Sequence, residues 1–397
     1  MKKNVVLFGA YDRYNYGDNL MPIVFHDYIK KYHAEKFEKT NFIFASITES
    51  DLSLYRSPKT KAIKDVYSTL IDGDAIIAVG GEILCAPNST LFLHMPRNKL
   101  VNDVLIKMNS LPLLRKIVQL SARICNPTPW DFPYIVDKSK LNEGVKVIYN
   151  TVGGSLNGLR VNKKVELTER LSSADYISVR DTRTQKNLSC INDVILAPDS
   201  VHIISDLYTD DYIESNVSDS ISIKLKSEYI CFQAAPSKIA SSLEDIVSFI
   251  KALSVNNQQK VVLLPIGYAS GHDDYHLLNR IHNELPTHTE LLFDLNLWEI
   301  MSVIKNSNLY IGTSLHGAIT ALTFGVPHFG LNKSIYKLDG FLNDWSVAPY
   351  NQCYSMKEIE TLSKNVAELP RDLLNEAVKI NNDAIKNNFN RVIDVIF

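Results

Sequence analysis

One stretch of the sequence, residues 309–332, restricts the fold more than any other. It starts with a short apolar segment, Leu309–Gly312, continues through Ser314 into a segment of small residues over 315–324, and reaches a second apolar segment through Gly-Val-Pro at 325–327. Serine is a favoured helix N-cap, and a glycine before proline can end a helix in a left-handed conformation. The pattern predicts a strand, a helix and a second strand, as in a parallel sheet covered by helices.

His316 is the residue of this stretch that suggests a function. Together with Leu315 and Gly317 it falls in the first turn of the predicted helix, where free backbone N–H groups and the helix dipole favour an anion. A histidine in such a turn can equally do no more than bond a neighbouring carbonyl. The turn is therefore a candidate site whose role depends on what the rest of the chain brings to it.

Length and composition are those of a folded globular protein with room for two domains. The chain has 397 residues, of which 45% are hydrophobic and 22% charged, and its net charge is -2, so nothing indicates nucleic-acid binding. Its five cysteines are scattered without a Cys-x-x-Cys pair, which argues against a disulfide framework or a structural zinc site. The first apolar run is too short for a signal peptide, and no stretch approaches the roughly 20 apolar residues that span a bilayer. We expect a cytoplasmic protein.

The first half of the chain alternates predicted strands with helices. Residues 4–10 predict a first strand, and a polar loop containing Asn15, Gly17 and Asp18 leads from it into a helix. No Gly-x-Gly-x-x-Gly is present, so a dinucleotide site is not supported. The three loop residues either form only the turn and the helix cap, or they line a ligand site.

Later strand ends carry further candidate residues. Gly80 and Gly81 either let a ligand approach the backbone closely or form an ordinary tight turn. Arg180 also follows a predicted strand, where its guanidinium can bind a carboxylate or phosphate, or can form a structural ion pair with Asp181, which caps the next helix. Asp199, in a Pro-Asp-Ser segment, either caps a turn or orients a sugar hydroxyl or a catalytic side chain.

Residues 88–140 break the alternation of strands and helices. Between residues 97 and 124, lysines and arginines are interleaved with leucine, isoleucine and valine, and Asp103 is the only acid between Leu91 and Arg123. A basic amphipathic insert of this kind can rest on the anionic inner face of a membrane or receive a lipid-linked acceptor. It can equally be a helical excursion that covers the sheet or contacts another subunit.

A polar and acidic segment, residues 206–227, predicts a linker between two domains. We expect one Rossmann-like domain over residues 1–205, including the basic helical insert, and a second over residues 228–397. The strands of the second domain are apolar enough to be buried on both faces of a parallel sheet. Residues 371–396 have helical periodicity and are expected to pack back across both domains.

One cluster in the sequence has the composition of a metal site. It consists of His272, Asp273, Asp274 and His276, at a predicted helix start. Acidic residues in a first turn cap the helix and complement its dipole, which explains the cluster better than metal binding does. We therefore predict no metal site.

The ordered set of motifs resembles the polysaccharide pyruvyl transferase family. The similar segments are Leu-His-Gly at 315–317 with Gly-Val-Pro at 325–327, Ser-Val-Arg-Asp at 178–181, Asn-x-Gly-Asp at 15–18, Gly-Gly at 80–81 and Pro-Asp-Ser at 198–200. The resemblance implies two Rossmann-like domains facing a cleft, as in GT-B glycosyltransferases, and phosphoenolpyruvate as the donor substrate. One departure is Ser314, because many relatives have arginine immediately before Leu-His-Gly.

The reaction implied by the resemblance forms a pyruvate ketal on a sugar of a surface polysaccharide or its precursor. Phosphoenolpyruvate is protonated at its methylene carbon, one sugar hydroxyl attacks the resulting oxocarbenium-like centre, and a second hydroxyl displaces phosphate. This chemistry needs a group that exchanges protons near neutrality, for which His316 is the candidate. Because a helix start disfavours imidazolium, a bound dianion would be required to keep His316 protonated. The reaction requires neither a metal nor a nucleotide cofactor.

The remaining candidates take supporting roles in this hypothesis. The donor carboxylate and phosphate would be bound by Arg180 and by the turn formed by Ser314, Leu315 and Gly317. The acceptor, carried on a lipid or a nucleotide, would lie in the cleft near the other candidates, which are Asn15, Gly17, Asp18, Gly80, Gly81, Asp181 and Asp199. The sequence does not specify the acceptor sugar.

Two other functions stay open. A GT-B glycosyltransferase would use the turn at 315–317 to hold the diphosphate of a nucleotide sugar. A catalytically silent subunit that binds glycan or assembles a surface-polysaccharide complex is conceivable because Ser314 replaces the arginine found in many relatives.

Overall fold

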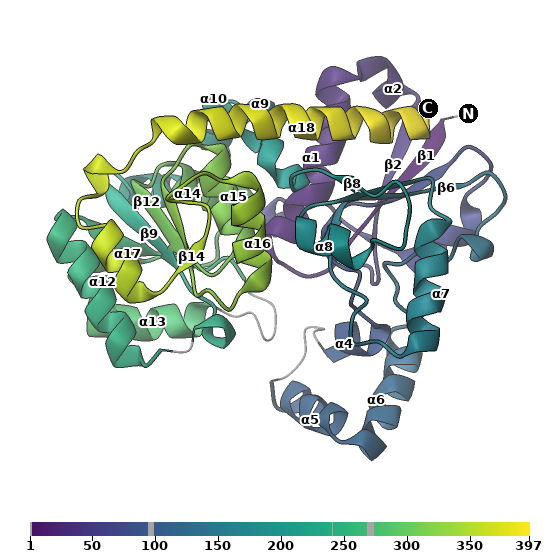
Figure 1. Ribbon diagram of the computed structural model, residues 1–397, viewed down its shortest axis with the longest axis horizontal. Helices are drawn as coiled ribbons and strands as arrows, with labels where there is room; N and C mark the ends of the chain where they lie inside the picture. The colour runs from purple at the N-terminus through teal and green to yellow at the C-terminus, as the bar shows by residue number, and fades with distance from the viewer. Residues whose placement is uncertain (1, 94–98, 240, 268–273) are drawn as a thin grey trace.

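The computed structural model describes residues 2–93, 99–239, 241–267 and 274–397. Two parallel sheets form its framework, one in each half of the chain (Figure 1). Every strand pair in both sheets is parallel. This is the doubly wound α/β class that the alternating sequence pattern predicts.

The first sheet has the order β3-β2-β1-β4-β6-β7-β8, and β5 pairs with β6. Its central strands are apolar at successive positions because helices cover both faces, which leaves no solvated side. The strands are β1 (Lys3–Phe8), β2 (Thr40–Ser46), β3 (Lys61–Ala62), β4 (Ala75–Ala78), β5 (Gly81–Glu82), β6 (Lys146–Gly153), β7 (Tyr176–Val179) and β8 (Ile195–Leu196).

The second sheet has the order β11-β10-β9-β12-β13-β14. Counted from its own first strand this is 3-2-1-4-5-6, the Rossmann order. The strands are β9 (Tyr229–Gln233), β10 (Lys260–Leu263), β11 (Thr289–Leu291), β12 (Leu309–Gly312), β13 (His328–Leu331) and β14 (Cys353–Tyr354).

Each sheet has a point at which the strand order reverses, between β1 and β4 in the first and between β9 and β12 in the second. The segments that leave these neighbouring strands diverge, and ligand sites of open α/β sheets form in the crevice between them. The loops after β1, β4, β9 and β12 are therefore where a site is expected. These loops contain most of the residues that the sequence singles out.

The helices of the first domain and of the connection between the sheets cover the first sheet and its edge. Helix α1 begins at Tyr16, earlier than the polar loop suggested. The predicted linker, residues 206–227, contains the short helices α10 and α11. These helices are α1 (Tyr16–Tyr32), α2 (Ala34–Glu38), α3 (Ile63–Val66), α7 (Val161–Ser172), α8 (Thr182–Asn187), α9 (Ile204–Leu207), α10 (Asp210–Glu214) and α11 (Asp219–Lys224).

The second domain contains the helices α12 (Leu243–Asn257), α13 (Tyr275–Glu284), α14 (Leu297–Lys305), α15 (Leu315–Thr323), α16 (Tyr336–Trp345) and α17 (Met356–Leu362). Two of its boundaries have local causes. Helix α12 begins at Leu243, because Ser242 caps it. Strand β11 ends at Leu291, and Asp294 just beyond it has a left-handed backbone with φ 57°, which a strand cannot contain.

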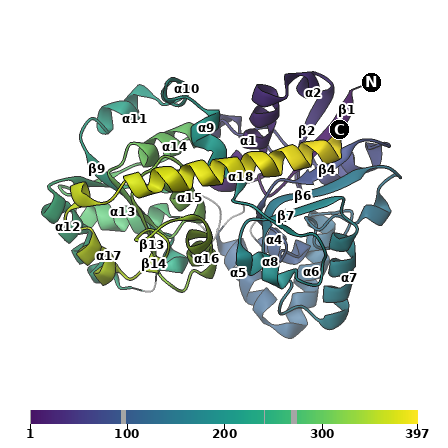
Figure 2. The same ribbon diagram turned by 45° about the horizontal axis from the view of Figure 1, so that its top comes forward.

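Helix α18 (Asp372–Ile396) lies across both domains (Figures 1 and 2). Its Asn388 donates to Oδ1 of Asn150 in the first domain at 2.7 Å. Its Asn381 donates to the carbonyl of Trp345 in the second domain at 2.8 Å. The prediction that the C-terminal segment packs back across both domains is thus confirmed.

The insert contains α4 (Asn88–Leu93), α5 (Lys99–Ser110) and α6 (Pro112–Cys125), which project from the first domain on the side away from α18 (Figure 1). Val118 and Ala122 of α6 form a small core with Phe92 and Leu93 of α4, separate from the main cores. The end of the insert does cover the sheet, as one interpretation of its sequence predicts, because Trp130, Tyr134 and Val136 belong to the core formed with β1, β4 and β6. Helix α6 packs in the small separate core instead. No helix of the described residues is long and apolar enough to cross a membrane.

Candidate active site

The turn between β12 and α15 has the predicted cap. Oγ of Ser314 accepts a hydrogen bond from the backbone N–H of Gly317 at 3.3 Å, so that N–H is not available to a ligand. The N–H groups of Leu315 and His316 have no hydrogen-bond partner within the described residues. These two groups are the first-turn donors that an anion can use.

His316 lies at the boundary between the two domains. Its imidazole is packed against Gly17 at the start of α1, where an added Cβ would stand 1.9 Å from both Cγ and Nδ1 of the ring. Only glycine at position 17 therefore leaves room for this imidazole. Beside this contact, the hydroxyls of Tyr16 and Thr320 are hydrogen-bonded at 2.9 Å and tie α1 to α15. The Asn-x-Gly-Asp loop thus fits around the histidine.

Asp199 pairs with His316 from within the first domain. Its Oδ2 lies 3.6 Å from Nε2 of His316, and its Oδ1 accepts from the backbone N–H of Val201 at 3.1 Å. Burial raises the pKa of Asp199, but His316 and then Arg180 outweigh burial and lower the pKa to about 2. Asp199 is therefore an anion near neutral pH, and it places a negative charge beside the imidazole of His316.

Arg180 is held by carboxylates, and it contacts the same oxygen of Asp199 that lies nearest His316. Its guanidinium lies 3.1 Å from Oδ2 of Asp199, 2.9 Å from Oε2 of Glu82 and 4.0 Å from Oδ2 of Asp181, and its side chain is 1% exposed. Burial lowers the pKa of Arg180, but Asp199 and Glu82 outweigh this and raise it. These carboxylates occupy the guanidinium, so Arg180 holds Asp199 in position. The predicted donor-binding role of Arg180 stays a prediction.

Two candidates near Arg180 have structural roles. Asp181 is buried, and its Oδ1 accepts from the backbone N–H of Thr184 at 2.6 Å, so it caps α8 as one interpretation of the sequence predicts. Glu82 also pairs with Arg183 at 2.8 Å. A Cβ at Gly153 would stand 2.8 Å from Nε of Arg180 and 2.9 Å from Glu82, so this glycine gives the ion pair its space.

Gly80 and Gly81 hold the first turn of α1 in place. Their φ values are 122° and 91°, in the range that favours glycine. A Cβ on Gly80 would stand 2.7 Å from Sδ of Met21, and one on Gly81 would stand 3.3 Å from Oδ1 of Asp18. The tight turn after β4 therefore packs directly against Asp18.

Two lysines of the second domain, which the sequence argument missed, lie near Asp18. Burial and the charge of Lys337 lower the pKa of Lys238 to about 8. Burial and the charge of Arg180 lower the pKa of Lys337, and Asp18 opposes the shift in both lysines. Within the described residues neither lysine forms an ion pair. Lys238 follows β9, so its position beyond a buried strand could have identified it as a candidate site residue. Lys337 lies in the first turn of α16, and nothing in the sequence singles it out.

Asn15 and Ser314 reach a small cavity of about 40 Å³ between the domains, which Lys238 and Asp274 also line. Asn15 forms an isolated antiparallel bridge with Gly267 of the second domain. Its side chain makes no cap bond; Oδ1 of Asn19 instead accepts from the N–H of Asn15 at 2.7 Å.

Asp274 belongs to the cluster that the sequence offered as a metal site. Its Oδ2 accepts from Gln233 at 2.8 Å and from the N–H groups of Ile266 and Gly267 at 3.1 and 3.2 Å. Burial raises its pKa although these donors oppose the shift. His272 and Asp273 lie outside the part of the chain that the structure describes. Within the described part, no group of three potential metal ligands occurs.

The structure thus brings seven groups to one place at the domain boundary. They come from the loops after β1, β8, β9 and β12 and from α16: Asn15, Gly17, Asp18, Asp199, Lys238, His316 and Lys337. Desolvated cations and free N–H groups next to a carboxylate-bound histidine can bind a small anion and exchange a proton with it.

Comparison with protein families gives one match for this chain. A family model described as polysaccharide pyruvyl transferase matches residues 15–334, which is more than half of the chain. The matched span includes the motifs around Gly17, Arg180 and His316. No curated protein sequence matches the chain.

Solved structures with a similar fold are sugar-nucleotide enzymes. UDP-GlcNAc 2-epimerase from Neisseria meningitidis, bound to UDP-GlcNAc, has a TM-score of 0.54 and 10% identity, with 99% of each chain covered. A putative UDP-N-acetylglucosamine 2-epimerase from Listeria monocytogenes has a TM-score of 0.51 and 9% identity over 100% of this chain and 96% of that one. At such identities the likeness shows the fold alone. It confirms the expected GT-B-like pair of Rossmann-like domains.

Proposed function

Because this chain belongs to the polysaccharide pyruvyl transferase family, we propose that it transfers the enolpyruvyl group of phosphoenolpyruvate to a sugar of a surface polysaccharide or its precursor, forming a pyruvate ketal. The observation that supports this most is the pairing of His316 with Asp199 at 3.6 Å in a boundary that also holds two desolvated lysines. A phosphate and a carboxylate need such cations, and protonation of a carbon needs such an acid.

His316 is the proton donor in this proposal. Its Nε2 faces Asp199, so we assign the other ring nitrogen, Nδ1, to the substrate. His316 gives its proton to the methylene carbon and takes one back from the first attacking hydroxyl. Phosphate leaves when the second hydroxyl attacks, and the proton of that hydroxyl is released with it. Asp199 keeps the imidazolium available throughout and does not itself titrate near neutrality.

Lys238 and Lys337 replace Arg180 as the proposed donor-binding cations. Both are half-buried with lowered pKa values, and within the described residues neither has a carboxylate partner, so a bound anion would stabilise their charged forms. The N–H groups of Leu315 and His316 add two donors at the start of α15. This arrangement also accounts for Ser314, because the charge that many relatives place before Leu-His-Gly is supplied here from other loops.

The test measures phosphate release from phosphoenolpyruvate in the presence of an acceptor glycan. We expect His316→Ala to lower the rate by about 10²–10⁴-fold, the usual contribution of general acid–base catalysis. His33→Ala, a partly exposed histidine beyond α1, is the matched control and should retain full activity. Full activity in His316→Ala would contradict the assignment.

Ligand stabilisation separates this function from the glycosyltransferase alternative. Phosphoenolpyruvate should raise the melting temperature of the wild-type protein and raise it less in Lys238→Met. Stabilisation by UDP or GDP but not by phosphoenolpyruvate would favour a nucleotide-sugar enzyme. Binding of a glycan without turnover of any donor would favour the silent subunit.

A further inference from the structure

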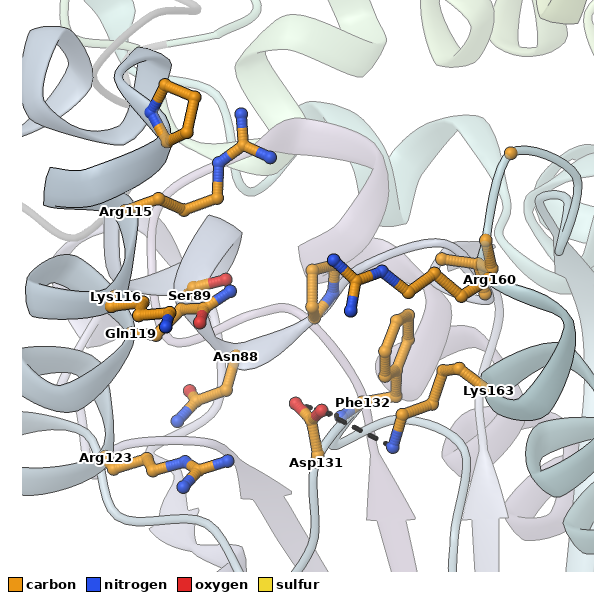
Figure 3. A pocket seen from close by; sticks show the side chains of 14 residues that line it. Asn88, Ser89, Arg115, Lys116, Gln119, Arg123, Asp131, Phe132, Arg160 and Lys163 are labelled. Atoms are coloured by element: carbon orange, nitrogen blue, oxygen red, sulfur yellow. Dashed lines mark hydrogen bonds and ion pairs between the residues drawn. The ribbon is translucent and has the colours of Figure 1, made fainter.

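A large cavity lies away from the domain boundary, between α6 of the insert and the start of α7 (Figure 3). Its volume is about 580 Å³. We call it the basic pocket, because its lining contains five basic residues and one acid: Arg115, Lys116, Arg123, Arg160, Lys163 and Asp131. Arg115 and Arg160 extend into the space between the two helices from opposite sides (Figure 3).

Most of the positive charge in the basic pocket is uncompensated. Lys163 is compensated, because it lies 2.8 Å from Glu166 and 3.7 Å from Asp131. Within the described part of the chain, Lys116, Arg123 and Arg160 form no ion pair, and Arg115 donates only to the carbonyl of Asn109. Like charges gathered around a cavity repel one another unless an anion joins them. The pocket therefore suits a group with several negative oxygens, such as a phosphate.

The same helix α6 carries an unpartnered apolar face. We call it the apolar stripe; its members are Leu113, Ile117, Leu120 and Ile124, whose side chains are between 49% and 86% exposed. At about 100° per residue, these four fall within roughly 60° of one another around the helix. The pocket residues Lys116 and Arg123 lie about a quarter turn away. Val101, Val104 and Ile106 of α5 are also exposed.

We propose that this region is a membrane-docking site, in which the basic pocket binds the phosphate of an anionic lipid and the apolar stripe enters the acyl layer. An interfacial helix has this composition, with an apolar face beside a strongly basic one. The negative surface of a cytoplasmic leaflet attracts such basic residues. Arg160 and Lys163 come from α7, outside the insert, so the pocket exists only in the folded domain.

Charge is the reason to prefer a lipid surface to a second copy of this chain as the partner. The protein as a whole is close to neutral, with a net charge of -2. A partner subunit would bring its own basic pocket to a symmetric interface, and like charges would face each other. An anionic bilayer neutralises the pocket and covers the stripe together. The proposal goes beyond the transfer reaction and does not depend on it.

The test is co-sedimentation of the full chain with phosphatidylcholine vesicles that contain phosphatidic acid, compared with phosphatidylcholine alone. We expect binding to the anionic vesicles only, weaker at high salt. Arg160→Glu and Arg123→Glu, which act from opposite walls of the pocket, should each weaken it at least ten-fold, since one charge near such a surface contributes about 1 kcal/mol and reversal counts twice. The double change Leu113→Ser and Ile117→Ser should weaken it roughly ten-fold.

Matched controls use exposed residues elsewhere. Lys357→Glu on α17 and Leu54→Ser, at a site 78% exposed, should bind anionic vesicles as the wild type does. Binding that is equal on neutral vesicles, or unchanged in both pocket variants, would overturn the proposal. So would a dimer in light scattering that the serine variant dissociates. A rise in melting temperature with inorganic pyrophosphate, without any vesicle binding, would also overturn the proposal. It would mark the pocket as a site for a soluble anion.

Discussion

The domain boundary and the basic pocket both gather positive charge, but they hold it in opposite ways. At the boundary, Arg180 is 1% exposed and is joined to three carboxylates, and Lys238 and Lys337 have lowered pKa values. In the basic pocket, Arg115, Lys116, Arg123 and Arg160 are exposed, and one acid faces five bases.

The difference follows from solvation. A buried charge needs a partner because losing water costs several kcal/mol. The guanidinium of Arg180 therefore stays paired with Asp199 and Glu82 and holds them in position. An exposed charge keeps its water and needs no partner, so it is available to an external anion and is sensitive to salt. This contrast supports the two proposals, a small substrate at the boundary and a large charged surface at the basic pocket.

The largest expected effect separates the two regions by stability. Arg180→Met leaves Asp199, Asp181 and Glu82 without their shared cation, and should lower the free energy of unfolding by about 3–5 kcal/mol. Arg115→Met in the basic pocket makes the same chemical change at an exposed site and should change it by less than about 0.5 kcal/mol. Urea denaturation of both variants measures this. Equal losses would contradict the contrast between the regions.

A second change addresses the fit between the domains. Gly17→Ala places a methyl group where the imidazole of His316 lies. Displacement of a catalytic group by about 1 Å can cost about 100-fold in rate, so phosphate release should fall by that order while the fold persists. Gly340→Ala is the matched control for glycine loss, because a Cβ there meets no atom within 4 Å and the residue does not have a positive φ. Unaltered activity in Gly17→Ala would show that His316 is not confined by α1.

Acid denaturation sharpens the comparison of buried and exposed carboxylates. The pKa of Asp199 is lowered from 3.8 to about 2 in the folded protein, so its stabilisation is complete above about pH 4 and is lost as pH falls through about 2. The loss should be about 2 kcal/mol and insensitive to salt. Asp51, paired with Lys59 on the surface, is the matched control, because salt should remove its contribution. Urea titrations of Asp199→Asn and Asp51→Asn from pH 5 downward measure both.

The smallest expected effect concerns Lys238. Because burial lowers its pKa to about 8, the lysine loses its charge as pH rises through that value, and affinity for phosphoenolpyruvate should fall by up to about ten-fold per pH unit. Lys238→Met should bind weakly at every pH and lose this dependence. Vesicle binding through the basic pocket should stay constant over the same range, since arginine remains charged. Isothermal titration between pH 7 and 9 measures the affinity of both proteins for phosphoenolpyruvate. Co-sedimentation over the same pH range measures vesicle binding.

The sequence by itself determined the repeating units. Periodicity and turn residues are local, so they located the central strands of both sheets, the cap at Ser314 and the left-handed Gly325, whose φ is 65°. The short strands β3, β5 and β14 were not predicted. They also placed His316 in a first turn, because a cap and a small-residue helix can be recognised within one stretch. The ordered motifs then indicated the family.

The tertiary structure decided which of these units share a site. Asp199 and His316 are 117 residues apart, and they meet only because the loops after β8 and β12 converge at the boundary between the domains. For the same reason, the sequence could not distinguish Arg180, which is enclosed by carboxylates, from Lys238, which lacks a carboxylate partner among the described residues. A side chain's type is local, but its solvation and partners depend on what folds against it.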